Sequence, residues 1–195
     1  MERSKQAFTT ITLVTIPVAI AINIAVGTII YNLKLPLYLD SIGTIMVGVL
    51  AGPWAGALTG LLSNLIWGLT GINVSYAPFA AVAAVIGMLA GLLGEAGWFR
   101  QWWKAILAGL VTGLVAAVVS APISAYVFGG VTGSGTDVVT AFFRGIGLGV
   151  LPSSFAQGVS SDPLDKALSF LVVFLVLKAL PLRFIARYPR SENVH

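Results

Sequence analysis

The sequence predicts an all-α membrane protein with six transmembrane helices, both termini cytoplasmic, and a single integral domain covering residues 1–195. Hydrophobic residues make up 57% of the chain and charged residues only 9%, which is more apolar surface than a water-soluble fold of this length can bury. One bilayer crossing needs about 20 apolar residues, so the chain has room for roughly six helices with short loops. Gly, Pro and polar residues divide the apolar runs accordingly.

The predicted helices follow these apolar runs. They cover residues 8–32, 41–51, 53–69, 77–94, 103–128 and 165–181. The second helix is too short to span a bilayer alone, so we expect it to be tilted, partial, or extended backward through the preceding loop. Gly52 and Pro53 separate it from the third helix, because proline can begin a helix without losing an internal hydrogen bond.

The basic residues predict the orientation. With both termini inside, eight Lys and Arg lie on the cytoplasmic side and three lie outside, in agreement with the positive-inside rule. The three are Lys34, Arg144 and Lys166. Four of the seven acidic residues are then expected on the outer side, namely Asp40, Asp137, Asp162 and Asp165. The net charge of +4 suits orientation in a lipid bilayer and gives no sign of nucleic-acid binding.

Residues 129–163 are rich in Gly and polar side chains. We expect a re-entrant or surface-lying segment, buried against protein or facing water. The alternative is a further crossing at residues 138–156. It would reverse the last helix and place the basic tail outside, which the charge rule disfavours.

Small residues recur every four positions along several predicted helices. The series are Gly52, Gly56 and Gly60; Gly87 and Gly91; Gly109 and Gly113; and Ala21 and Ala25. Such spacing lets two helices approach closely, so we expect most of these residues to pack within the bundle. The first helix is the one expected to face a partner. Its Asn23 lies away from the alanine face and is expected to form an interhelical hydrogen bond.

Several of these features, in this order, resemble one family. The first helix has an A-x-x-x-A pattern at Ala21 and Ala25, its loop ends at Asp40, and a G-P-x-x-G hinge at residues 52–56 runs into GALTGLLSN. DKALSFLVVFLVLKALPLRF stands near the C-terminus. Over nearly the whole chain, these features resemble the substrate-binding S components of energy-coupling factor (ECF) transporters.

The resemblance implies a protein of the prokaryotic plasma membrane that binds a vitamin or related small organic micronutrient with high affinity. It would dock to a membrane-embedded T component driven by two cytoplasmic ATPases and deliver substrate by toppling in the bilayer. In that family the A-x-x-x-A face contacts the T component, so Ala21 and Ala25 are the expected partner-binding residues. The chain has no G-x-x-x-x-G-K-[ST] loop, so ATP hydrolysis falls to the partners.

By the same resemblance, the substrate pocket lies among the last three helices under the loops 31–40 and 70–78. Tyr31 belongs to the first loop. Asn73 and Tyr76 in the second offer an amide and an aromatic ring, a pair suited to a flat heterocycle, although both are also ordinary residues of an interfacial turn.

Other predicted pocket residues come from the helices. Ser120, Ser124 and Tyr126 lie near the outer end of the fifth helix. Serine commonly bonds back to its own helix, which is the alternative for the first two. Asn64 and Trp67 lie about one turn apart on the third helix and face either the cavity or the bundle.

Charged residues of the outer segment have two explanations. Arg144 is expected either to pair with Asp137, two helical turns earlier, or to bind an anionic ligand group. Asp165 is expected to cap the last helix at its N-terminus.

The residue inventory excludes several chemistries. There is no Cys, and the single His is residue 195, so we expect no disulfide, metal site, cofactor or imidazole catalysis in the core. The expected cargo is a small, partly aromatic organic molecule. The alternative function is a self-sufficient secondary transporter or channel. It needs a mid-membrane carboxylate, whereas the acids are expected at helix ends. A membrane sensor and a membrane enzyme are weaker alternatives, for lack of a signalling module and of a nucleophile with its base.

Overall fold

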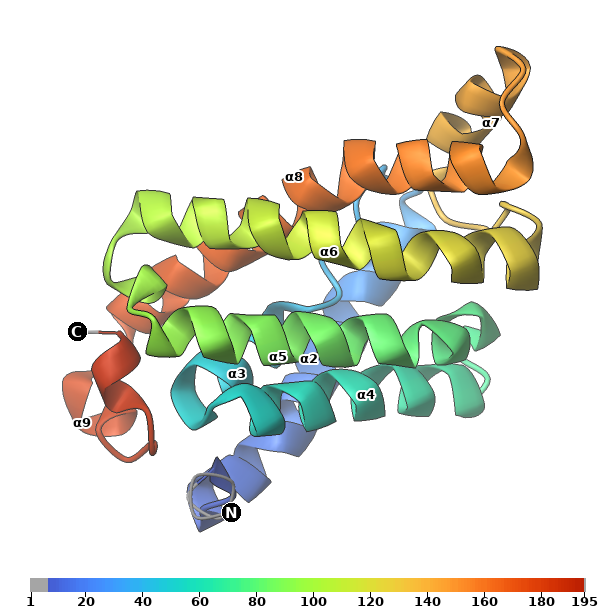
Figure 1. Ribbon diagram of the computed structural model, residues 1–195. Helices are drawn as coiled ribbons and strands as arrows, with labels where there is room; N and C mark the ends of the chain where they lie inside the picture. The colour runs from blue at the N-terminus through green and yellow to red at the C-terminus, as the bar shows by residue number, and fades with distance from the viewer. Residues whose placement is uncertain (1–6, 195) are drawn as a thin grey trace.

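The computed structural model describes residues 7–194, and every regular element in that range is a helix (Figure 1). The α-helices are α2 (Thr10–Asn32), α3 (Ile42–Ala51), α4 (Pro53–Leu69), α5 (Ala80–Glu95), α6 (Trp102–Phe128), α7 (Asp137–Gly145), α8 (Val150–Ala179) and α9 (Leu182–Ile185). Short 3₁₀ turns are η1 (Val74–Phe79), η2 (Trp98–Arg100) and η3 (Ser191–Asn193). Three stretches are long and apolar enough to cross a membrane: α2, Val74–Glu95 and α6.

The first five predicted helices are confirmed to within a few residues, but the prediction for the last helix is wrong. Helix α8 begins at Val150 instead of residue 165. Its first half buries small and polar side chains against the bundle, including Ser153, Gln157 and Gly158, so it carries no strong lipid-facing signal. The expected irregular segment is therefore shorter. It covers residues 129–149, and the alternative crossing at 138–156 is not present, because α7 is nine residues long and ends at Gly145.

Helix α3 is short because the chain before it turns back into the bundle. The α2–α3 loop, residues 33–41, leads from the end of α2 to the middle of α8, where Asp40 and Ser41 contact Lys166. The ten-residue helix α3 then spans only part of the length of the bundle, where it packs against α2, α4 and α5. Gly52 ends it with a φ of +99°, a conformation that glycine adopts without steric cost, and Pro53 begins α4.

The glycine series lie where helix backbones meet, as predicted, except for Gly52, which has only the side chains of Arg190 and Glu95 beside it. A β-carbon added at Gly56 would collide with the carbonyl of Gly87, and one added at Gly87 would collide with that of Gly56. Helix α6 approaches α8 in the same way, because a β-carbon at Gly113 would meet the backbone of Asp162 and Pro163. These close approaches give dispersion contacts that a lipid-facing helix lacks.

Asn23 makes the interhelical hydrogen bonds that were expected of it. Its amide nitrogen donates to Thr44 Oγ1 (2.8 Å) and Ser63 Oγ (2.9 Å), and its oxygen accepts from the backbone N–H of Gly43 (2.7 Å). Asn23 thereby joins α2, α3 and α4 at one fully buried point.

The two ends of the bundle differ (Figure 1). The C-terminal segment with α9 and η3 lies at the same end as the start of α2, where Tyr188 and Thr15 share a hydrogen bond between hydroxyls (2.8 Å). Asn193 Nδ2 donates to the carbonyl of Val49 at the end of α3 (2.8 Å). Turn η1 and helix α7 lie at the opposite end, which we call the loop end.

Candidate functional site

A cavity lies toward the loop end, among α2, α4, α5, α6 and α8. The centre of a water-sized sphere can reach about 90 Å³ of it, several times the space that one water needs. The α2–α3 loop and turn η1 contribute to its wall, together with residues of the loop 129–136. An internal space this large, between helices of a bundle, is the usual form of a small-molecule site.

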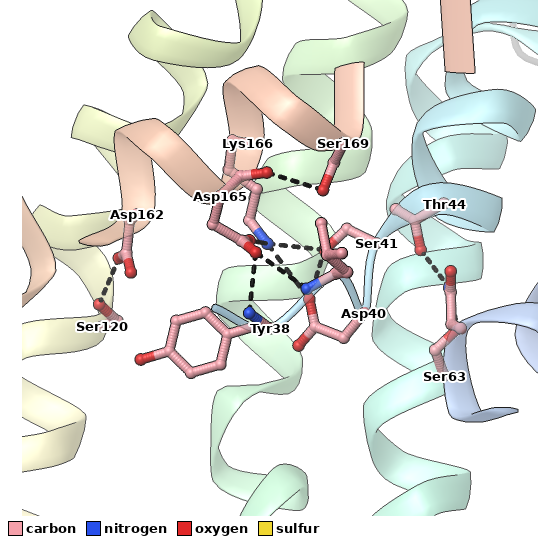
Figure 2. Close-up of polar contacts among 12 residues, drawn as sticks. Tyr38, Asp40, Ser41, Thr44, Ser63, Ser120, Asp162, Asp165, Lys166 and Ser169 are labelled. Atoms are coloured by element: carbon pink, nitrogen blue, oxygen red, sulfur yellow. Dashed lines mark hydrogen bonds and ion pairs between the residues drawn. The ribbon is translucent and has the colours of Figure 1, made fainter. Parts of the chain in front are cut away.

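Charged residues gather on one wall of the cavity (Figure 2). Lys166, in the middle of α8, places its ammonium 2.6 Å from Asp165 Oδ2 and 3.2 Å from Asp40 Oδ1. It also donates to Ser41 Oγ (3.0 Å). The other oxygen of Asp165 accepts from the backbone N–H groups of Tyr38 and Leu39, at 2.8 and 2.9 Å. This buried charge cluster therefore fixes the α2–α3 loop to α8.

Asp162 lies one helical turn before Lys166 but takes no part in that cluster. Figure 2 shows its side chain directed toward Ser120 of α6 instead, with a single long hydrogen bond of 3.4 Å to Oδ2. Within residues 7–194, its other oxygen has no partner. The residue lines the cavity and is only 6% exposed. A buried carboxylate with so few partners is energetically costly unless something else occupies the space beside it.

Neutral polar groups also face the cavity without partners. The Asn64 amide, the Ser124 hydroxyl and the Tyr76 hydroxyl make no hydrogen bond within the part of the chain that the structure describes. Each of these residues is more than nine-tenths buried, and Asn64 is 4% exposed. Buried amides and hydroxyls nearly always have a partner, so these three are free to bond with whatever occupies the cavity.

Aromatic rings form another part of the cavity wall. Tyr76 stacks on Trp67, with ring centroids 3.5 Å apart and planes 16° from parallel. Tyr31 meets Tyr76 edge to face at 6.4 Å. Because Tyr31 and Tyr76 line the cavity, it offers a flat apolar surface next to the polar groups.

Tyr38 connects the α2–α3 loop with two other elements. Its hydroxyl lies 2.9 Å from Thr136 Oγ1 and accepts from Gln157 Nε2 at 3.3 Å. Burial raises the pKa of the Tyr38 phenol above its ordinary value, and the charge of Asp162 raises it further. The phenol therefore stays protonated near neutral pH and keeps its hydrogen for donation.

Four of the seven predicted pocket residues lie in one cavity wall: Tyr31, Asn64, Tyr76 and Ser124. The other three lie outside it. Asn73 accepts from the backbone N–H of Ser75 (3.1 Å) and begins η1, whereas Tyr126 is 77% exposed on α6. Arg144 is exposed and contacts the carbonyl of Gly129.

Two further expectations about charged residues are wrong. Asp137 does not pair with Arg144, because its carboxylate accepts from the backbone N–H groups of Thr132 and Gly133 and so closes the turn before α7. Asp165 does not cap a helix N-terminus, because α8 has already run for fifteen residues at that point.

The sequence interpretation did not include the acidic cavity wall. Asp162, Asp165 and Lys166 were placed at the outer start of a helix, whereas the structure buries them in its middle. The spacing of the three, around Pro163, is helical and would have pointed to one face if α8 had been recognised in full. Tyr38 and Gln157 gave no comparable signal.

Two other results concern possible metals and partners. Among residues 7–194 no group of three His, Asp or Glu side chains is placed to hold a metal ion. Ala21 and Ala25 are both exposed on α2, on the same side as the exposed Val14 and Val18. Their side chains therefore contact nothing that covers them within the bundle.

The fold and the cavity have no recognised counterpart in the comparisons. Neither protein-family models, curated proteins nor solved structures gave a match to the chain.

Proposed function

We propose that this protein is the substrate-binding S component of an ECF-type importer in a prokaryotic plasma membrane, with a vitamin or related small organic micronutrient as its substrate. The observation that carries the proposal is the cavity, in which Asn64, Tyr76, Ser124 and Asp162 are buried and have hydrogen-bonding capacity that the described protein leaves unused. A pocket with stacked rings and a few unpaired polar groups suits a small, partly aromatic molecule.

In the proposed arrangement, α4, α8 and the half-length α3 complete six crossings with the three most apolar stretches. The described chain begins and ends at the same end of the bundle, which fits cytoplasmic termini and an outward-facing loop end. The basic residues at the other end, Arg100, Lys104, Lys178, Arg183 and Arg187, agree with that orientation.

The exposed face of α2 supports docking to a T component. Ala21 and Ala25 leave a shallow groove one turn apart, flanked by larger apolar side chains such as Val18 and Ile29. In lipid, a second helix gains contact energy only where side chains are small enough for close approach. ATP would be hydrolysed by the two partner ATPases.

The test is co-expression of this chain with a T component and two ATPases, followed by affinity purification and mass spectrometry of the bound small molecule. Replacing Ala21 and Ala25 by Leu should abolish co-purification of the T component and ATP-driven uptake, because the added bulk fills the groove. Ligand binding by the isolated protein should remain. Ala141→Leu on the exposed surface of α7 is the matched control. Equal loss of binding and uptake in the double variant would assign the alanines to internal packing instead.

A secondary transporter stays as the second candidate because of one observation. The expectation that every acid lies at a helix end or in a loop is wrong, since Asp162 and Asp165 are buried in the middle of α8. Mid-membrane carboxylates are typical of ion-coupled transport. Proteoliposomes that contain this chain alone separate the two functions: uptake driven by a proton or sodium gradient without ATPases would favour the second.

A further inference from the structure

We infer that the cavity selects a small organic cation with a flat ring, held between the Asp162 carboxylate and the rings of Tyr31 and Tyr76. This inference rests on the proposed ligand-binding function and adds the charge of the ligand to it. It follows from which donors and acceptors in the cavity already have partners.

Among the described residues that line the cavity, Lys166 is the one cation, and it is not free to bind an anion. An ammonium group has three N–H donors, and Lys166 directs them to Asp165, Asp40 and Ser41. Its charge is also balanced by two carboxylates within 3.2 Å. A carboxylate or phosphate on a ligand would therefore find no unused positive group among the described residues that line the cavity.

The acceptors, in contrast, are not saturated. Asp162 has one long hydrogen bond from Ser120 and one oxygen without a partner, although it is 94% buried. Asp40 uses one oxygen for both Ser41 and Lys166, and its second oxygen has no partner within residues 7–194. Both residues line the same cavity, so two anionic oxygens can accept from one ligand.

The balance of charges in the cavity wall also favours a cationic ligand. The Lys166 ammonium pairs with the carboxylates of Asp40 and Asp165, and the third carboxylate, that of Asp162, has no ion pair among the described residues. Burial disfavours the charged form of Asp162 in the empty site, and a ligand cation placed beside it would stabilise that form. An anionic ligand would destabilise it.

The remaining wall fits the body of such a cation. Tyr31 and Tyr76 line the cavity, and electron-rich aromatic rings attract organic cations; the Lys34 ammonium already lies over the ring of Tyr31, 4.3 Å from its centroid. The unpaired Asn64 amide and Ser124 hydroxyl supply hydrogen bonds for the polar edge of a ring. The cavity thus contains both an acidic group for the charge and aromatic rings for the body of such a ligand.

The test compares three probes that share one ring and differ in charge: 1-methylnicotinamide (cationic), nicotinamide (neutral) and nicotinate (anionic). The purified chain in detergent is melted at neutral pH with each probe at about 10 mM, and dissociation constants are taken from the concentration dependence. We expect the cation to bind at least about tenfold more tightly than either of the others.

Asp162→Asn is the decisive variant, because it keeps the shape and removes the charge. It should weaken binding of the cation by about tenfold or more, while the affinity for nicotinamide should change by less than about threefold. Glu192→Gln is the matched control, since it removes an exposed carboxylate at the other end of the bundle. A ligand-free melting temperature at or above that of the parent protein shows that folding is preserved, because Asp162→Asn also removes a buried charge.

The inference is overturned if the neutral or anionic probe binds as tightly as the cation, if the cation causes no shift in melting temperature, or if Asp162→Asn affects all three probes alike. These results leave the proposed function standing when the chain still co-purifies with a T component. Selective binding of the cation without any such assembly would instead reject the ECF proposal and keep the inference.

Discussion

Lys166 shows how this bundle holds a charge that lipid would exclude. Its three donors have three acceptors, and Asp165 in turn accepts from two backbone N–H groups of the α2–α3 loop. Charge-assisted bonds of this kind offset the loss of water around each ion. The cluster therefore stabilises the loop conformation only while every member is present.

Lys166→Met should lower the free energy of unfolding by about 3 to 5 kcal/mol, because Asp165 would remain buried without its counter-ion. Combining it with Asp165→Asn should recover part of the loss, since the stranded charge is then gone. Reversible denaturation by dodecyl sulfate in mixed micelles measures both variants. Arg183→Met, at an exposed position, is the control. Additive effects in the double variant would mean that the two residues act independently.

Single residues differed in how well the sequence revealed them. Asn23 was predictable because a polar side chain within an apolar helix must find a partner. Asp162 and Lys166 were not, because charged residues next to a proline also read as a helix start, and only the long-range contacts with Asp40 and Ser120 show otherwise.

Where two helices of this protein come close together, glycine lies at the contact on both helices or on one of them. Gly56 and Gly87 face each other across α4 and α5, whereas Gly113 faces the backbone of α8 at Pro163. The glycine spacing alone predicted these contacts, because period and residue size decide whether two helix surfaces can touch.

Gly87→Ala and Gly113→Ala should each lower the free energy of unfolding by about 1 to 3 kcal/mol, since the added methyl group meets backbone atoms that cannot move independently. Gly145→Ala is the matched control: no atom lies within 4 Å of its added β-carbon, so little change is expected. The same denaturation assay applies. A neutral result for Gly87→Ala would show that α4 and α5 can separate without loss.

The first half of α8 is a helical segment that the sequence did not predict. Hydropathy finds helices that face lipid, and it found α2, α5 and α6. Residues 150–164 bury small and polar side chains and expose only a few apolar ones, among them Phe155 and Val159, so their mean hydropathy is low and they resembled a loop.

Taken whole, the molecule closes its two ends differently. At one end the C-terminal segment is tied to the helices by the Glu95–Arg190 ion pair (3.0 Å) and the hydrogen bond from Asn193 to Val49. At the loop end two chain segments meet over the cavity: the α2–α3 loop and the loop 129–136. The contacts that hold these two segments are unequal.

The α2–α3 loop is bonded to buried ions, while the facing loop 129–136 reaches it through the Tyr38–Thr136 hydroxyl pair and an exposed contact from Lys34 to Gly133. Thr136→Val should therefore speed hydrogen–deuterium exchange of amides in residues 131–136 and leave those of Tyr38 and Leu39 slow, as peptide-resolved mass spectrometry would show. Equal acceleration of both loops would mean that they open as one unit.

The two chain segments at the loop end are held by unequal contacts, and this difference bears on how a ligand would leave the cavity. If the cavity binds a ligand as proposed, we expect the ligand to leave beside the loop 129–136, so that the opening of this loop sets the dissociation rate and the wall fixed by Lys166 sets the affinity. Residence time and affinity can then be altered separately, by changes on opposite sides of the same opening.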